Sequence, residues 1–453
     1  MNPQPVMTRR LLYLIVFIEG FCSLGAEVIA LRQIVPHLGS SIVVTAPTIG
    51  CFLLALALGY HRGAKVDGDY LAVVARNFLI ASLLAGVGLA GVSVDLIFDS
   101  LGVPALAYLV FVGGVLCPVA WLLGQTVPIL TNLFAHQRVG AASGNALAWS
   151  TLGSFIGSLL LSLVIMQWLG VSAAVASCGL LLLAGYLLAG ARTWRPATVT
   201  FLAAALTLGA NLWLRPVVDT AYASYAVETV ALAGSIDPRV FKNNNSVASL
   251  IDESAPPHYA RYVDHVRSIL LDGLGLRGRE ILVLGAGGFT LSHRETANRY
   301  TYVDIDPSIR QIAEQRFLRE PAQGEFIADD ARRFVKRSDR RFDVVVVDVF
   351  SSHTAIPAHL VTREFWRDAR RALTANGVMI ANLILDPSLA TPYARNILAT
   401  IESVYGRCAV EVLQKNQALS NVVVTCRNDH PSQPPSLYVD ELNAADFDLA
   451  RSR

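Results

Sequence analysis

Long apolar runs fill the first half of the chain, and charged residues become frequent only after about position 215. A helix that crosses a bilayer needs about 20 mainly apolar residues. The runs predict seven such helices, at 11–34, 41–60, 71–96, 105–130, 145–168, 171–191 and 197–214. The last run is the shortest, and the sequence leaves open whether it spans the membrane.

Basic residues collect in alternate loops of this half. They are Arg9, Arg10, Arg62, Lys65, His136, Arg138, Arg192 and Arg195. Such residues mark the cytoplasmic side. Six spans would return the chain to the cytoplasm, whereas a spanning seventh run would leave the C-terminal half outside. We expect a multi-pass protein of the bacterial inner membrane with its C-terminal half in the cytoplasm, where the cofactor inferred below is made.

Several polar residues lie at membrane depth within these runs. They are Glu19, Glu27, Arg32, Arg76, Gln125 and Asn145. Charges inside a membrane usually face the bundle interior or a water-filled cavity. Glu27 and Arg32 are therefore either an internal ion pair or part of a substrate site. The small residues of 144–160 permit close helix packing.

The composition argues against two classes of function, nucleic-acid binding and zinc binding. Only 16% of residues are charged, the formal net charge is +2, and neither a basic block nor a basic-aromatic stripe is present, so nucleic acid is not an expected partner. None of the six cysteines forms a CxxC pair, so a zinc site is not expected. We interpret the cysteines as small buried hydrophobic residues.

The second half alternates between strand and helix patterns. Short strands are expected within 220–252, with a tight turn at Asn243–Asn245, and a helix at 256–274. Strands follow at 280–285, 300–306, 325–330, 342–350 and 377–384, with helices after the first four, and a hairpin pairs 408–414 with 420–426. This alternation predicts a parallel, doubly wound sheet. The expected domains are 1–214, 215–255, 256–430 and a polar tail at 431–453.

Candidate site residues follow the predicted strands, where such sheets bind ligands. Gly285, Gly287 and Gly288 come after the first strand, and glycine lets a backbone approach a ligand closely. Asp304, Asp330 and Asp348 end the next three strands. A lone acid at such a place is as often a helix cap. Three acids after a glycine turn indicate a nucleoside site.

Five strings in this order and spacing, LVLGAGGFTL, YVDID, ADDARRF, VVVDVFSS and AHLVTREFW, resemble the spermidine synthase (polyamine aminopropyltransferase) family. The whole chain looks like bacterial membrane proteins in which a transporter-like helical half is fused to such a domain. The resemblance implies a transmembrane helical bundle of six or seven helices and a C-terminal α/β Rossmann-like domain of methyltransferase type, preceded by a small β subdomain. It also implies aminopropyl transfer from decarboxylated S-adenosylmethionine to an amine, without a metal.

The resemblance assigns roles by position. Asp304 would bind the ribose, Asp330 and the adjacent Ala331 the adenine, and Asp348 would be the general base that deprotonates the attacking amine.

Tyr262, Asp264 and Ser351 would lie on the acceptor side. This chain departs from the family there: Tyr262-Val263-Asp264 replaces YHE or YQE, and Ser351 replaces a second acid. The glycine loop GAGGFT also lacks the acid of the family's GGGDGG.

These departures keep other functions open. The acceptor is an amine or a lipid-like molecule delivered through the membrane half, and membrane lipids are expected partners. A methyltransferase that uses intact S-adenosylmethionine is the first alternative. The second is a transporter whose C-terminal domain senses a nucleoside or polyamine. A homodimer is one of the assemblies that remain open.

Overall fold

The computed structural model describes residues 9–39, 41–134, 139–190, 196–213, 217–220, 222–244, 246–349, 356–428, 438–440, 445 and 448–449. The chain divides into two compact units. The N-terminal unit comprises Met1–Leu38 and Val44–Ala221, and the C-terminal unit comprises Gly39–Val43 and Tyr222–Arg453. Most of the predicted tail at 431–453 lies outside the described residues.

Six helices of the N-terminal unit are long and apolar enough to cross a membrane, within the residues described. They are Arg9–Leu38, Ile42–Gly63, Tyr70–Gly88, Pro104–Thr131, Gly140–Leu169 and Val171–Leu188, and a shorter apolar helix covers Ala197–Leu212. The elements are α1 (Arg9–Leu38), α2 (Ile42–Gly63), α3 (Tyr70–Leu83), α4 (Gly91–Leu101), α5 (Pro104–Phe111), α6 (Cys117–Gly124), α7 (Thr126–Thr131), α8 (Val139–Leu159), α9 (Met166–Leu169), α10 (Val171–Leu188), α11 (Pro196–Leu208) and the short strand β1 (Val218–Asp219). Single π-helical turns continue α3, α5, α8 and α11 as η1 (Leu84–Gly88), η2 (Val112–Leu116), η4 (Leu160–Ile165) and η5 (Gly209–Trp213), and a 3₁₀ turn, η3 (Asn132–Phe134), follows α7.

The prediction of one helix at 71–96 is wrong. The third span ends at Gly88, and α4 begins at Gly91 as a separate helix. Ala90 between them has an extended backbone (φ −62°, ψ 140°), which no helix can contain.

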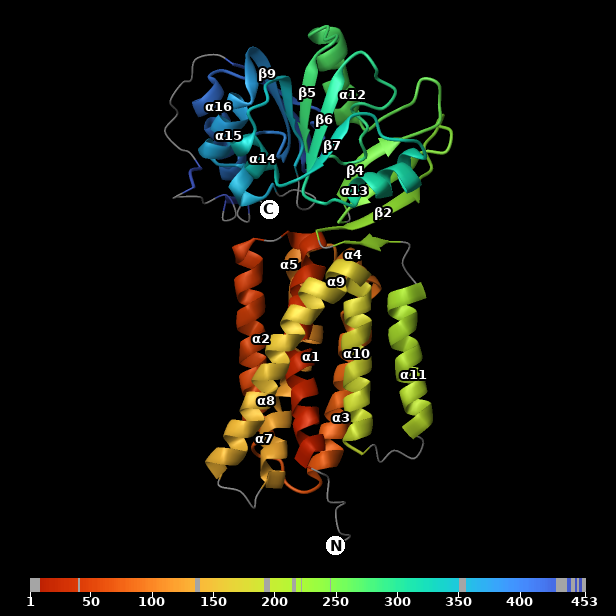
Figure 1. Cartoon of the computed structure of the whole chain (residues 1–453), viewed down its shortest axis with the longest axis vertical. Helices are drawn as coiled ribbons and strands as arrows, with labels where there is room; N and C mark the ends of the chain where they lie inside the picture. Colours follow the sequence, from red (N-terminus) through yellow and green to blue (C-terminus); the bar gives the residue numbers. More distant parts are fainter. Residues whose placement is uncertain are drawn as a thin grey trace. The chain divides into compact units, whose positions relative to one another are not determined.

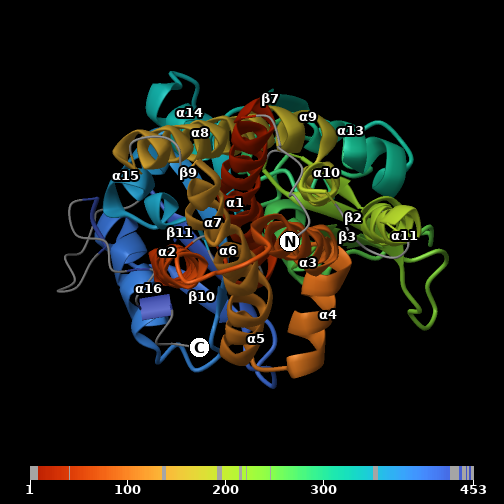
Figure 2. The ribbon, with the colours of Figure 1, turned by 90° about the horizontal axis from the view of Figure 1, so that it is seen from below.

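Helix α1 is the central helix of the N-terminal unit (Figure 2), and 72% of its most apolar window is buried. It packs against α8 through glycines. A Cβ atom on Gly153 would lie 2.2 Å from the carbonyl oxygen of Phe17, and one on Gly157 would lie 2.3 Å from that of Phe21. Only glycine permits so close an approach. Gly153 and Gly157 therefore serve helix packing, as the sequence predicts for the small residues of 144–160.

The C-terminal unit begins with antiparallel strands β2 (Ser224–Thr229), β3 (Arg239–Asn243) and β4 (Ser246–Ile251), which pair in that order. Asn244 turns the β3–β4 hairpin with a left-handed backbone (φ 49°), a conformation that asparagine tolerates. The predicted tight turn is therefore present, although Asn245 lies outside the described residues.

A seven-stranded sheet follows, in the order β10-β11-β9-β8-β5-β6-β7 (Figure 1). Its strands are β5 (Glu280–Leu284), β6 (Arg299–Asp304), β7 (Glu325–Ala328), β8 (Phe342–Val347), β9 (Leu373–Leu385), β10 (Ala409–Val412) and β11 (Ser420–Arg427). The first five are parallel, and the β10–β11 hairpin joins β9 antiparallel. In β8 the run Val344–Val347 is at most 2% exposed, as expected for a strand covered on both faces.

The helices of this unit are α12 (Arg261–Ser268), α13 (Ile309–Ile312), α14 (Ala331–Arg337), α15 (Arg363–Arg371) and α16 (Pro392–Tyr405), with π turns η6 (Ile269–Gly273) after α12 and η7 (Ala313–Leu318) after α13 and the 3₁₀ turn η8 (Ala358–Leu360) before α15. The sequence analysis missed α16, which begins with Thr391 as its N-cap and Pro392 in its first turn.

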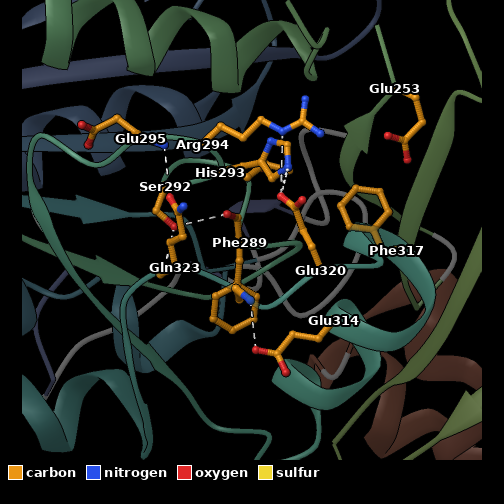
Figure 3. A network of polar contacts seen from close by, with 12 residues as sticks. Glu253, Phe289, Ser292, His293, Arg294, Glu295, Glu314, Phe317, Glu320 and Gln323 are labelled. Carbon is orange, nitrogen blue, oxygen red and sulfur yellow. Dashed lines mark hydrogen bonds and ion pairs between the residues drawn. The ribbon is translucent and has the colours of Figure 1, made fainter. Parts of the chain in front are cut away.

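The helix predicted after the first strand of the sheet is absent. Residues 286–298 form successive turns, and Phe289 and Arg294 have left-handed backbones (φ 58° and 53°) that interrupt a helix. Buried polar contacts hold these turns in place (Figure 3). His293 Nε2 lies 2.7 Å from Glu320 Oε1, and the Ser292 hydroxyl donates to the carbonyl oxygen of Gln323 at 2.7 Å.

The interpretation of every cysteine as a free, buried residue is also wrong. Cys408, beside β10, and Cys426, in β11, form a disulfide, with their Cα atoms 4.5 Å apart. Antiparallel pairing of β10 with β11 brings the two residues opposite each other. The remaining cysteines, Cys22, Cys51, Cys117 and Cys178, are free thiols of the N-terminal unit.

Candidate active site

The strand order places β5 beside β8 at the point where the chain changes direction across the sheet. From β5 the chain continues through β6 and β7 on one side, and β8 is followed by β9 on the other. Ligands bind beyond the carboxyl ends of the strands at such a switch point. Gly285 follows β5 and Asp348 follows β8, so both predicted site residues lie at this point.

The loop after β5 touches the end of β8 at Gly285. The Gly285 backbone is left-handed (φ 91°), and a Cβ atom there would lie 2.1 Å from the carbonyl oxygen of Asp348. Gly287 is also left-handed (φ 49°). A Cβ atom on Gly288 would lie 2.4 Å from the ring of Phe317. All three predicted glycines are therefore required by the local backbone or packing.

Asp304 is the last residue of β6, and backbone amides orient its carboxylate. The Ala286 N–H donates to Oδ2 at 2.9 Å, and the Asp306 N–H donates to Oδ1 at 3.0 Å. Burial raises the pKa of Asp304, and these amides oppose that shift. The carboxylate thus links the glycine loop to the end of the adjacent strand, where a ribose would lie in a nucleoside site.

Asp330 is the N-cap of α14. Its Oδ1 accepts from the Arg333 N–H at 2.8 Å, and its Oδ2 lies 3.4 Å from His359 Nε2. Ala331, the first residue of the helix, is 7% exposed. The capping role that a lone acid suggests is therefore real at Asp330. Its assignment to adenine stays a prediction.

Asp348 is the most connected of the three acids. Its Oδ1 accepts from Asn382 Nδ2 at 2.8 Å, and Asn382 Oδ1 accepts from Asn421 Nδ2 at 3.0 Å. The Tyr262 hydroxyl offers its single proton to two acceptors, the Ala248 carbonyl at 2.7 Å and the Asp348 carboxyl. Asn382 and Tyr262 thus orient this carboxyl, and Asn421 holds Asn382 in place.

The electrostatics of Asp348 suit a proton acceptor. Burial raises its pKa to about 6, and the hydrogen bonds from Asn382 and Tyr262 limit the rise. At pH 7 the group is therefore mostly ionised and still basic enough to take a proton. A pKa close to the working pH is what general-base catalysis favours.

The predicted acceptor-side residues are not all brought together. Tyr262 reaches Asp348 from α12. Asp264 is exposed, and it points away from Tyr262 because two residues along a helix differ by about 200°. Ser351 lies outside the described residues.

Sequence reasoning missed three residues of the site, Asn382, Asn421 and Ser249. Ser249 Oγ accepts from the Gly288 N–H at 3.0 Å and so joins β4 to the glycine loop. Asn382 and Asn421 are amides inside otherwise apolar strands, GVMIANLI and SNVVVTC. A polar residue in a buried strand needs a partner, and that signal was available. Among the described residues no group of three or more His, Cys, Asp or Glu is arranged to hold a metal ion.

Comparison with known proteins shows what the chain is similar to. Residues 258–429 match the model of the spermine/spermidine synthase domain. A polyamine aminopropyltransferase of Vibrio vulnificus is 31% identical over 154 residues, which cover 32% of this chain and only 50% of that protein. One of Mycobacterium tuberculosis is 25% identical over 428 residues, which cover 84% of this chain and 78% of that protein.

The second alignment must extend into the N-terminal unit, because 84% of the chain is far more than the C-terminal unit contains. Among solved structures, a probable spermidine synthase from Corynebacterium glutamicum superposes with a TM-score of 0.40 and 19% identity, covering 48% of this chain and 81% of that chain. Residues 258–429 thus match the spermine/spermidine synthase domain, and the chain is a homologue of the polyamine aminopropyltransferases.

Proposed function

We propose that this protein transfers an aminopropyl group from decarboxylated S-adenosylmethionine to an amine, with Asp348 as the general base. The observation that carries the proposal is the position of Asp348. Asp348 follows β8 at the switch point between β5 and β8, its backbone carbonyl faces Gly285, and its carboxyl is oriented by Asn382 and Tyr262.

The residues of the site fit a nucleoside donor. Left-handed glycines at 285 and 287 shape the loop after β5, and Asp304 presents a carboxylate at the adjacent strand end. When bound, the donor supplies a sulfonium that makes the neighbouring propyl carbon electrophilic.

Asp348 would act on the other reactant. An ammonium has no lone pair, so the acceptor must lose a proton before its nitrogen can attack. Asp348 takes that proton, the C–N bond forms as the C–S bond breaks, and the electron pair of the C–S bond stays on sulfur as a neutral thioether. The Tyr262 hydroxyl and the Asn382 amide hold the carboxyl on the acceptor side throughout.

One sequence feature supports a second candidate. The loop GAGGFT has no acid to contact the amino end of the donor, where the family has GGGDGG. A site without this acid discriminates less between the decarboxylated and the intact donor. Methyl transfer from intact S-adenosylmethionine is therefore the alternative function.

The N-terminal unit would lie in a membrane, since six of its helices have the required length and apolarity. Membrane lipids would then surround it, and the acceptor could be an amine with lipid character.

A product assay decides between the two reactions. Full-length protein purified in detergent would be mixed with either donor and a panel of di- and polyamines, and the nucleoside product identified by mass spectrometry. Methylthioadenosine from the decarboxylated donor supports aminopropyl transfer, and S-adenosylhomocysteine from the intact donor supports methyl transfer.

The Asp348→Asn variant is the matched control, because it keeps the size of the side chain and removes the base. We expect normal donor binding and a turnover lower by about 10²–10⁴. Turnover close to that of the wild type would overturn the assignment of the base.

A further inference from the structure

The disulfide of the C-terminal unit bears on which side of the membrane that unit works. Cys408 and Cys426 are bonded, whereas the four cysteines of the apolar N-terminal unit are free. Disulfides form and persist in oxidising compartments such as the bacterial periplasm and are rare in the cytosol. This distribution is typical of a domain that folds outside the cytoplasm.

The path of α11 is a second, independent observation. Gln33 near the end of α1 donates from Nε2 to the carbonyl oxygen of Leu89 at 2.9 Å, just after the third span. Asn211 in η5 donates from Nδ2 to the carbonyl oxygen of Gly86 at 2.7 Å, at the end of that same span. The carboxyl ends of α1, of the third span and of α11 with η5 therefore lie at one end of the bundle.

The length of this last helix is close to that of a full crossing. Helix α11 has 13 residues and η5 has 5, and together they rise about 27 Å at 1.5 Å per residue. The hydrocarbon core of a bilayer is about 30 Å thick. The helix packs along the bundle, with Thr207 against Gly86 and Gly179, rather than lying across its end. The seventh apolar run therefore crosses the unit.

Charge identifies the two ends. Arg9 and Arg10 begin α1, and Arg62 and Lys65 end α2 and enter the next loop. That loop lies at the starting end of α1, because the third span ends where α1 ends. The opposite end carries His37 and Asp95, whose side chains approach to 3.3 Å, and Asp99. By the positive-inside rule the end at Arg9 is cytoplasmic.

We propose that the C-terminal unit lies on the non-cytoplasmic side of the membrane, where Cys408 and Cys426 are oxidised, and that its acceptor is an amine of that compartment. The chain crosses the membrane seven times and leaves the bundle at the end opposite Arg9. This replaces the cytoplasmic location expected from the sequence, which rested on where the donor is made. The acceptor class rests on the proposed function; the location does not.

Thiol labelling in intact cells tests the location. Lys65 and Arg337 are both exposed, one in the loop after α2 and the other at the end of α14. Each would be replaced in the full chain, as Lys65→Cys and Arg337→Cys, and treated with a membrane-impermeant maleimide before and after permeabilisation. Wild-type protein measures the background from the native thiols.

We expect the Arg337→Cys variant to be labelled in intact cells and the Lys65→Cys variant only after permeabilisation. Labelling of the Arg337→Cys variant only after permeabilisation would overturn the proposal. That result would leave the transferase assay untouched, and an inactive enzyme with the expected labelling would refute the proposed function but not the location.

The disulfide provides a second readout. Cells would be treated with a permeant alkylating agent before lysis, and the protein then denatured, reduced and labelled with a second agent. We expect the second label on Cys408 and Cys426 alone. First-label alkylation of both would show that they are thiols in the cell and would contradict the proposal.

Discussion

At the scale of single residues, the environment of Asp348 makes its carboxylate more basic and lowers the stability of the native protein at neutral pH. Asp348 is half-buried at the end of a buried strand, and burial raises its pKa from 3.8 to about 6. Asn382 and Tyr262 stabilise the ionised form only in part. The native state therefore binds the proton more tightly than the unfolded chain does, and ionising the group at neutral pH costs stability.

The pH dependence of turnover follows from this pKa. Asp348 must be ionised to accept a proton, so turnover at saturating substrate should rise with the slope of one proton between about pH 5 and 7 and then level off. Initial rates across this range provide the test. A profile that is flat through pH 6 would show that another group sets the rate.

The Asp348→Asn variant should become more stable than the wild type as the pH rises, because only the wild type carries the ionisable carboxyl. Below about pH 4 Asp348 is protonated in both the native protein and the unfolded chain. The contribution of its raised native pKa to the stability of the native protein is then fully present. That stabilisation is lost as the pH rises through about 6. The neutral variant should therefore match the wild type near pH 4 and exceed it above pH 7, by at most about 3 kcal/mol. Thermal midpoints in detergent at the two pH values measure the difference; equal midpoints above pH 7 would contradict it.

The sequence predicted the residues at the strand ends but not those that orient them. Gly285, Asp304 and Asp348 could be located because a parallel sheet collects the residues that follow its strands. Asn382 and Asn421 lie within strands, and the hydrogen bonds from Asn421 to Asn382 and from Asn382 to Asp348 depend on which strands are neighbours. The order β11-β9-β8 is a property of the whole sheet that no local pattern encodes.

At the scale of elements, the β10–β11 hairpin is fastened at one end by the disulfide and carries Asn421 near the other. The bond closes a loop across a sequence separation of 18 residues. Its main effect is to reduce the conformational freedom of the unfolded chain. The sequence predicted the hairpin from its alternating apolar residues, but not the bond, because pairing of two cysteines requires the register of the strands.

Loss of the disulfide should affect stability more than catalysis. The Cys408→Ser variant should be destabilised by about 3 kcal/mol, the value expected for a loop of this length. Turnover at 20 °C should stay within about twofold, because β11 remains paired with β9 along its length. Chemical denaturation and initial rates give the two values. A large loss of turnover in a folded variant would show that the bond positions Asn421.

The contact between α1 and α8 can be tested by substitution, because α8 contains one glycine inside the contact and one outside it. Gly153 has no space for a Cβ atom, whereas Gly144 has no heavy atom within 4 Å of one. Gly153→Ala should separate the two helices and lower the thermal midpoint in detergent by several degrees. Gly144→Ala should leave it unchanged or raise it slightly, because alanine favours a helix more than glycine does. Equal effects of the two changes would mean that α1 and α8 are not packed through their backbones.

At the scale of the whole molecule, composition and periodicity predicted the division into an apolar helical half and an α/β half, because each depends on long stretches of chain. They could not decide the seventh crossing. That question depends on Asn211 and Thr207 packing against Gly86, a contact between residues more than 100 positions apart.

The direction of α11 has a consequence for how the enzyme would behave in a living cell. An active site beyond the membrane meets what is in the medium, so intact and broken cells should process added donor at the same rate. The enzyme would show no latency, and the thioether left by each turnover would appear directly in the medium. Washed cells given the decarboxylated donor and an amine test this, with cells that carry the Asp348→Asn variant as the blank. Activity that appears only when the cells are opened would return the site to the cytoplasm.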